Sequence, residues 1–295
     1  MINTLKKYAS ENAPGIFGLN YKVWKWISQT EPKPFITIVK AAIKLGIHHP
    51  SWKQALIAVI PKNNKQDMAL PKSYRPIQLI ECLGKLVEKI VVHCIYYDIG
   101  KYELMLFNQF RGCSNSSYLN ADLSLTHDIL TAWKKGLISS FLAMDIKGFF
   151  DHVDHACLLD VLTHKGFPPN IFQWVSSSLQ DRFVRVQVDD HVGDPHPQIV
   201  GVPQGSPVSP VLTCIYSSTV LEELNLHPIF YQSDTQLLPI GPRTYIDDFG
   251  FLAISDDLET NTLLLHKSLD RAVNTLTRIG MSIDPDKCDL MHFSW

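Results

Sequence analysis

The sequence lacks the features that mark several classes of protein. Its 295 residues contain no apolar run near the roughly 18 residues that a membrane-spanning helix needs, and its start, MINTLKKYASENAPG, has no signal-peptide core. We therefore expect an intracellular protein that does not interact with a membrane. Positive and negative charges are nearly balanced, since the sequence has 27 Lys and Arg and 29 Asp and Glu. This balance excludes a uniformly basic nucleic-acid coat.

Paired cysteines are also missing. The six cysteines are scattered singly, without the Cys-x-x-Cys spacing of a zinc clip or a redox couple. Cys288 and His292 are four residues apart, but two ligands without a second pair make a weak metal site. We expect reduced thiols, with neither a disulfide framework nor a structural zinc ion.

The charge that is present is unevenly distributed. Residues 1–75 hold twelve basic and three acidic residues, a net charge of +9, and the remainder carries −11. This asymmetry suggests an N-terminal surface that meets phosphates and a C-terminal part that collects cations. Solvated faces without a function are the alternative.

The apolar pattern predicts an α+β protein. Helices are predicted at 34–46, 80–99, 152–166, 168–181, 206–224 and 257–279. Strands are predicted at 52–60, 139–145, 183–189 and 281–293, with a hairpin at 244–254. A polar loop rich in lysine and proline is predicted at 61–76.

Two aspartates stand at the ends of predicted strands. Asp145 ends the strand at 139–145, and Asp247 lies at the tip of the hairpin 102 residues later. Both carboxylates can therefore emerge at the same end of one antiparallel sheet. Mg²⁺ binds through one or two carboxylates plus substrate phosphates, which is the arrangement that phosphoryl transfer requires. The alternative is that these aspartates only form turns.

Five strings, read in order, favour the first interpretation. They are SYRPIQL (73–79), AMDIKGFFDHV (143–153), GVPQGSPVSPVL (201–212), YIDDF (245–249) and GMSIDPDKCDL (280–290). Together they resemble the ordered motifs of reverse transcriptases, specifically those of non-LTR, LINE-like retrotransposons. The resemblance implies an RNA-directed DNA polymerase, a nucleotidyltransferase that adds dNTPs to the 3′-hydroxyl of a DNA primer on an RNA template. The expected location is the nucleus or the cytoplasm, and the resemblance suggests the nucleus.

The resemblance further implies a subdomain plan. Residues 1–138 would form a largely helical fingers subdomain with a basic N-terminal part. Residues 139–295 would form a palm, an antiparallel sheet with helices on one face. Since the sequence ends at Trp295, soon after the last motif, we expect the thumb of the full-length relatives to be absent and the chain to be truncated after the palm.

The resemblance assigns the catalytic roles to acidic residues and one lysine. Asp145 resembles the first metal-binding carboxylate, with the Ile146 carbonyl beside it, and Asp247 resembles the second, with Asp248 as a helper. The implied cofactor is a pair of Mg²⁺ ions, for which Mn²⁺ is a possible substitute. Lys287 resembles a late-palm lysine that protonates departing pyrophosphate.

Other positions resemble substrate contacts. Phe150 stands where the family places a steric gate against a 2′-hydroxyl, and ordinary core packing is its alternative. Its neighbour Phe149 departs from the small residue that is usual there. Gln204 and Gly205 form a turn whose backbone approaches a flat ligand, with Gln204 on the nucleotide or the template base. Tyr245 would face the primer end or pack in the sheet.

Two basic residues complete the predicted site. Arg75 resembles the fingers arginine that meets the triphosphate, and Lys62 is a second candidate from the polar loop. Three readings of the chain remain open: a catalytic core, a nucleic-acid-binding remnant that has lost the chemistry, and an inert relic of an element. The sequence carries no signal for an oligomeric state.

Overall fold

We describe the protein from a computed structural model that places residues 1–62, 67–70, 73–106, 118–189, 191–226, 230–232, 237–239, 241–245 and 248–294. The chain divides into two compact units, each made from two stretches of sequence. Unit 1 contains Met1–Asp98 and Leu162–Pro210, and unit 2 contains Ile99–Val161 and Val211–Trp295. Among the helices of these described residues, none is long and apolar enough to cross a bilayer.

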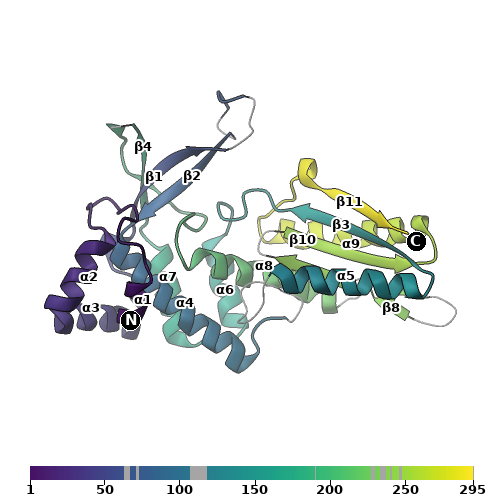
Figure 1. The fold of residues 1–295 in the computed structure, drawn as a ribbon, viewed down its shortest axis with the longest axis horizontal. Helices are drawn as coiled ribbons and strands as arrows, with labels where there is room; N and C mark the ends of the chain where they lie inside the picture. The colour runs from purple at the N-terminus through teal and green to yellow at the C-terminus, as the bar shows by residue number, and fades with distance from the viewer. Residues whose placement is uncertain are drawn as a thin grey trace. The chain divides into compact units, whose positions relative to one another are not determined.

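Unit 1 contains a small mixed sheet (Figure 1). Its strands are β1 (Gln54–Pro61), β2 (Tyr74–Ile80), β4 (Phe183–Val188), β5 (His191–Val192) and β6 (His196–Pro197). The order is β2-β1-β4-β5, and β6 also pairs with β4. β1 and β2 form an antiparallel hairpin, whereas β1 and β4 run parallel. The strands predicted at 52–60 and 183–189 are confirmed. The end of the loop predicted at 61–76 is already strand, since Tyr74 pairs with Pro61.

The helices of unit 1 bury their apolar faces in one core. They are α1 (Ile2–Lys6), α2 (Tyr21–Thr30), α3 (Pro32–Lys44), α4 (Cys82–Tyr102), which continues into unit 2, and α7 (Pro169–Leu179), with a 3₁₀ turn, η1, at Pro50–Trp52. Asn20 caps α2 by accepting hydrogen bonds from the Lys22 and Val23 amides. Tyr21, Leu86 and Trp174 are almost completely buried. The helices predicted at 34–46, 80–99 and 168–181 are confirmed.

Unit 2 contains an antiparallel sheet with β3 at its centre. Its strands are β3 (Ile138–Asp145), β9 (Gly241–Tyr245), β10 (Asp248–Ser255) and β11 (Asp289–Phe293), in the order β11-β3-β10-β9. All three pairings are antiparallel, and Figure 1 shows β11, β3 and β10 side by side. The predicted antiparallel sheet, strand and hairpin are confirmed. A separate pair joins β7 (Phe230–Gln232) to β8 (Leu237–Pro239).

One face of this sheet is covered by α9 (Leu258–Arg278). Asp257 caps the helix by accepting a 2.7 Å hydrogen bond from the Thr260 amide, and Gly280 follows its end with φ of +73°. Asn261 donates hydrogen bonds to the Ile138 carbonyl and to Ser140 Oγ, so the Ser140 face of β3 faces α9. The predicted helix at 257–279 is confirmed.

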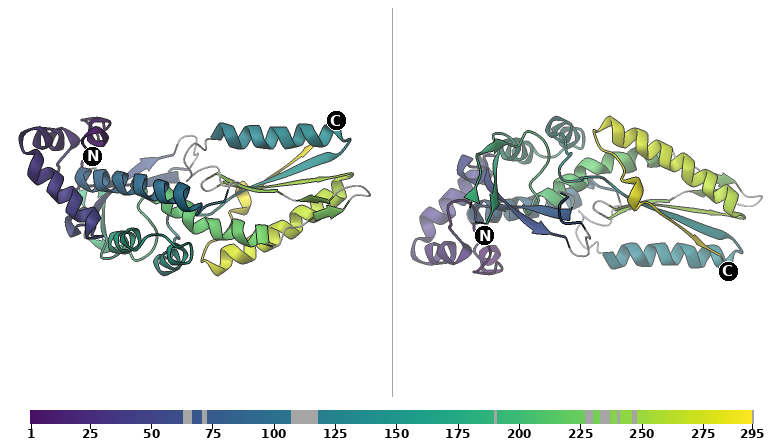
Figure 2. Two further views of the ribbon diagram at one scale, coloured as in Figure 1. Left: turned by 90° about the horizontal axis from the view of Figure 1, so that it is seen from below. Right: turned by 90° about the horizontal axis from the view of Figure 1, so that it is seen from above.

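The opposite face of the sheet is covered by α5 (Tyr118–Lys134), contrary to our expectation of helices on one face only. Figure 2 shows the sheet between α5 on one side and α8 (Ser209–Leu226) with α9 on the other. The physical reason is that the second face is also apolar. Phe141 follows Ser140 and points to that face, and Leu252, which is opposite Phe141 in the register, is buried.

The C-terminal segment differs from the continuous strand predicted at 281–293. Ile283 forms an isolated bridge with Ile146, Pro285–Lys287 forms a 3₁₀ turn (η3), and β11 begins only at Asp289. Pro285 has no N–H to donate to a strand ladder, which accounts for the break. Lys287 therefore precedes the last strand instead of lying in it. Similarly, α6 begins at His155 and ends at His164, within the helix predicted at 152–166.

Candidate active site

Asp145 ends β3 directly opposite the first residue of β10. In the register of these strands Asp145 is the partner of Asp248, and Asp248 is also the partner of Tyr245 across the β9–β10 hairpin. Only Ile246 and Asp247 separate Tyr245 from Asp248. In the sequence, Asp247 is therefore the residue directly before the Asp248 that pairs with Asp145. Asp247 and the side chains of Tyr245 and Asp248 lie outside the described residues, so the roles predicted for them stay predictions.

Lys287 contacts the carboxylate of Asp145. Its Nζ donates a 2.5 Å hydrogen bond to Asp145 Oδ2 and lies 3.4 Å from Asp284 Oδ2. The hydrogen bond with Asp145 raises the pKa of the Lys287 ammonium. The group is therefore protonated at neutral pH, as a general acid must be. This contact joins residues that are 142 positions apart in the sequence.

The backbone around Asp145 is held by the segment that carries Lys287. The Asp284 amide donates a 2.9 Å hydrogen bond to the Asp145 carbonyl, and the Lys147 amide donates one of the same length to the Ser282 carbonyl. The bridge between Ile146 and Ile283 lies between these two bonds. Asp284 was not singled out from the sequence, although it lies three residues before Lys287. Its two contacts fix both the Asp145 backbone and the Lys287 ammonium.

The turn after β3 contains two adjacent phenylalanines that differ in burial. Phe149 is buried, whereas Phe150 is partly exposed, and their rings meet edge to face with centroids 5.7 Å apart. Gly148 adopts φ of +56° in this turn. Phe149, the departure from the family pattern, therefore fills space in the core, and Phe150 is the ring that retains access to solvent.

The chemistry of this strand end fits a divalent cation. Among the described residues, no three His, Cys, Asp or Glu side chains are grouped to hold a metal ion. However, Mg²⁺ takes only one or two protein carboxylates and completes its shell with water and substrate phosphates. The Asp145 side chain is 21% exposed and already attracts one cation, the Lys287 ammonium. Asp145 can thus supply one hard oxygen ligand.

The two predicted basic residues lie on one hairpin of unit 1. Arg75 is exposed on β2 opposite Ile60. The Lys62 amide donates a 2.8 Å hydrogen bond to the Ser73 carbonyl, which extends the pairing beyond β1. Since Lys62 is two residues after Ile60, alternation places Lys62 and Arg75 on the same face of the hairpin. The hairpin therefore presents two positive charges together.

The turn with Gln204 and Gly205 is packed against β2 in the same unit. The Gln78 amide donates a 2.7 Å hydrogen bond to the Gln204 carbonyl. Gly205 has φ of +122°, and a Cβ on it would lie 2.6 Å from the Gln78 carbonyl oxygen. Position 205 thus requires a glycine because the backbone of β2 lies too close for a Cβ atom. Sequence reasoning missed Gln78, although it lies in the quoted string SYRPIQL.

We expect Gly205→Ala to destabilise the protein by about 1–3 kcal/mol, because alanine combines a disfavoured φ with the clash against Gln78. Urea unfolding measures this change. Gly100→Ala is the matched control, since Gly100 lies in α4 and a Cβ there would meet nothing within 4 Å. It should be neutral or slightly stabilising. Equal unfolding free energies for the two variants would contradict the packing of this turn.

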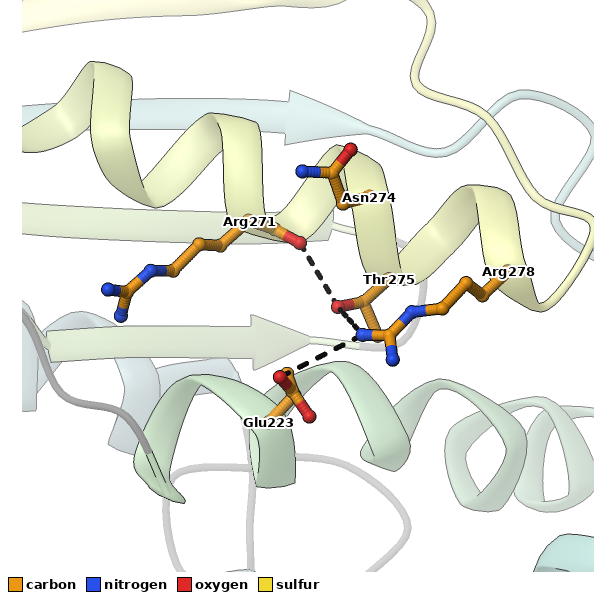
Figure 3. Close-up of a pocket in the computed structure, with 5 residues that line it drawn as sticks. All are labelled: Glu223, Arg271, Asn274, Thr275 and Arg278. Atoms are coloured by element: carbon orange, nitrogen blue, oxygen red, sulfur yellow. Dashed lines mark hydrogen bonds and ion pairs between the residues drawn. The ribbon is translucent and has the colours of Figure 1, made fainter.

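A pocket between α8 and α9 contains none of the predicted site residues (Figure 3). Its volume is about 350 Å³, and its lining residues are Glu223, Arg271, Asn274, Thr275 and Arg278. Arg278 Nη2 donates a 3.0 Å hydrogen bond to Thr275 Oγ1 and lies 3.8 Å from Glu223 Oε1. The contact between Arg278 and Glu223 connects α9 to α8 on the face of the sheet that α9 covers. We assign the pocket no part in the reaction.

Comparison with protein families decides the assignment. Residues 60–294, which include all five strings, match the family described as reverse transcriptase (RNA-dependent DNA polymerase). The chain belongs to the reverse transcriptase family.

Similar curated proteins come from retrotransposons, which confirms the resemblance read from the motifs. The RNA-directed DNA polymerase from mobile element jockey of Drosophila melanogaster is 26% identical over 99% of this chain and 31% of its own length. The probable RNA-directed DNA polymerase from transposon X-element of the same organism is 29% identical over 62% of this chain and 20% of its own. This reverse transcriptase chain thus spans about a third or less of the curated relatives that it matches.

A solved structure shares the fold. Apo telomerase from Candida tropicalis, truncated from the C-terminal domain, superposes with a TM-score of 0.57 at 16% identity, covering 93% of this chain and 56% of the other. At this identity the likeness concerns the fold alone. It agrees with the mixed α+β architecture of a reverse transcriptase.

Proposed function

We propose that this chain is the core of an RNA-directed DNA polymerase from a non-LTR retrotransposon. It would add dNTPs to the 3′-hydroxyl of a DNA primer on an RNA template. The observation that carries the proposal is the strand register that sets Asp248, in the string Tyr245-Ile246-Asp247-Asp248, opposite Asp145. Membership of the reverse transcriptase family supports it.

In this proposal the carboxylates hold the metal. Asp145 and Asp247 bind Mg²⁺, or Mn²⁺ in its place, with the Ile146 carbonyl as a further ligand and Asp248 as a helper. A bound pair of such ions lowers the pKa of the primer hydroxyl and neutralises charge on the triphosphate. Lys287 provides the proton that the departing pyrophosphate takes up. Its hydrogen bond to Asp145 supports this assignment.

The remaining residues bind and select substrates. Arg75 and Lys62 bind the triphosphate, since both are cations on one hairpin face. Gln204 contacts the nucleotide or the template base, and Tyr245 faces the primer end. Phe150 blocks a 2′-hydroxyl. We also retain residues 1–138 as the fingers and residues 139–295 as the palm, and the nuclear location, as predictions.

Primer extension tests the proposal. The chain is incubated with an RNA template annealed to a DNA primer, dNTPs and Mg²⁺, and the products are resolved by length. We expect extension that stops when the metal is chelated. A chain that binds the duplex on filters but never extends the primer would contradict the enzymatic function.

The second candidate is a nucleic-acid-binding remnant without polymerase chemistry. The pair of cations on the β1–β2 hairpin and the net charge of +9 in residues 1–75 support it. Such binding would weaken steeply with salt, because phosphate contacts release counterions. An intact Asp145–Lys287 pair favours the enzyme, since a binding protein has no chemical need for it.

Lys287→Ala is expected to slow the chemical step by about 100-fold, which is typical for loss of a general acid. The reason is that the alanine side chain has no proton to give, whereas the Lys287 ammonium is held at Asp145, where the proposed reaction takes place. Single-turnover incorporation of one nucleotide measures the step separately from product release. Lys267→Ala, on the exposed side of α9, serves as the control. An unchanged single-turnover rate for Lys287→Ala would show that the lysine is not the general acid and serves only as a counter-ion of Asp145.

A further inference from the structure

Unit 1 buries a polar cluster that the proposed reaction does not use. Glu88, His48, Arg182 and Ser206 are each at most 5% exposed and come from four separate parts of the chain. Burying ionisable groups is costly unless they are paired and hydrogen-bonded, and apolar residues of the same volume are often at least as stable. A contribution to packing alone therefore does not explain the cluster.

Glu88 connects α4 to the turn that carries Gln204. Its Oε2 accepts a 2.7 Å hydrogen bond from Ser206 Oγ, and its Oε1 lies 3.7 Å from His48 Nε2. Ser206 Oγ also accepts a 3.2 Å hydrogen bond from the Val208 amide. Ser206 thus joins the Glu88 carboxylate to the chain on the far side of the turn.

The turn is held at two points and exposed between them. The Ser206 amide donates a 3.1 Å hydrogen bond to the Pro203 carbonyl, and the Gln204 carbonyl accepts from the Gln78 amide. Pro203 and Ser206 are buried, whereas Gln204 is partly exposed and Gly205 is exposed. The anchors therefore lie inside unit 1, and the two residues between them are presented at its surface.

The cluster contains one acidic side chain, Glu88, beside the basic residues Arg182 and His48. Arg182 is buried, remains charged at any ordinary pH, and donates through Nη1 to the Ser178 carbonyl at 2.9 Å. Burial raises the pKa of Glu88, and the Arg182 guanidinium opposes that rise. Burial, followed by the charge of Arg182, lowers the pKa of His48 to about 3, so His48 stays neutral. Glu88 is thus the acidic side chain of the cluster, and its Oε2 accepts the hydrogen bond from Ser206 Oγ.

We propose that Glu88 is a positioning residue that, through Ser206, fixes the Pro203–Gly205 turn and thereby the orientation of Gln204. The proposal rests on the proposed function, in which Gln204 contacts the nucleotide or the template base. Glu88 touches no substrate itself. Its loss should therefore impair nucleotide binding more than the chemical step.

Ser206→Ala tests the proposal, because it removes one hydroxyl and leaves Glu88 and Arg182 in place. We expect the KM for dNTP to rise about tenfold, as for loss of a hydrogen bond to a charged group, with kcat changed less than twofold. Ser206→Thr keeps the hydroxyl and should restore most of the affinity. Ser178→Ala is the matched control, since Ser178 is a buried serine in the same unit that donates to the Val175 carbonyl at 2.8 Å. It should lose similar stability without a change in KM.

Hydrogen exchange gives a readout that needs no activity. In Ser206→Ala the amides of Gln78 and Ser206 should exchange faster than in the parent, and in Ser178→Ala they should not. A parent chain that fails to extend primers would refute the proposed function, while exchange would still report the anchoring. Equal KM changes in Ser206→Ala and Ser178→Ala, or faster exchange with an unchanged KM, would overturn the positioning role.

Discussion

Asp145→Ala is expected to reduce primer extension by about a thousandfold or more while the protein stays folded. A carboxylate that holds the metal contributes several kcal/mol of charge stabilisation in the transition state, and its methyl replacement supplies none. Stability should change by no more than about 1 kcal/mol, because the side chain is partly exposed and its partner Lys287 lies at the surface. The measurement is the rate of single-nucleotide addition, paired with thermal unfolding.

Two further variants separate charge from shape. Asp145→Asn keeps the size of the side chain but removes its charge, and it should fail as completely as Asp145→Ala. Asp247→Ala should fail equally if the second carboxylate shares the metal. Asp160→Asn, at an exposed position of α6, should extend at the parental rate. Extension by Asp145→Ala at the rate of the Asp160→Asn control would refute the metal-binding assignment.

Phe150→Ala is expected to raise the incorporation of ribonucleotides relative to deoxyribonucleotides by about 10- to 100-fold. The partly exposed Phe150 ring is the bulk that the proposal sets against a 2′-hydroxyl, and steric discrimination of this kind has that magnitude. Competition between rNTP and dNTP on one template measures the ratio of the two kcat/KM values.

The buried neighbour provides the control for this change. Phe149→Leu alters the ring that packs edge to face on Phe150, and it should cost about 1 kcal/mol of stability. It should leave the choice of sugar unchanged. If both variants, or neither, change the ratio of ribonucleotide to deoxyribonucleotide incorporation, Phe150 packs in the core and does not act as a steric gate.

Much of the fold follows from local pattern. Alternation in Phe183–Val188 identifies β4, and Asp257 with Gly280 marks the two ends of α9. The parallel pairing of β1 with β4 and the position of α5 do not follow in this way, because periodicity gives the apolar side of an element but not its partner. The break at Pro285 is a local feature, since proline has no N–H to donate to a strand ladder.

The site was predicted less completely than the fold. The resemblance named Asp145 and Lys287, which the structure brings into contact. It did not point to Asp284 or to the bond between Glu88 and Ser206, which joins residues 118 positions apart. Contacts of this kind depend on tertiary packing, for which one sequence carries no periodic signal. The roles of Asp247 and of the Tyr245 side chain stay predictions.

The most direct test of a metal shared by Asp145 and Asp247 is a crystal structure of the chain with Mn²⁺ and a dNTP, in which anomalous scattering locates the metal. We expect anomalous peaks for the bound ions, at least one of them coordinated by carboxylate oxygens of both Asp145 and Asp247, with Lys287 displaced from Asp145 Oδ2. A structure in which these two carboxylates share no ion would contradict the metal-binding assignment.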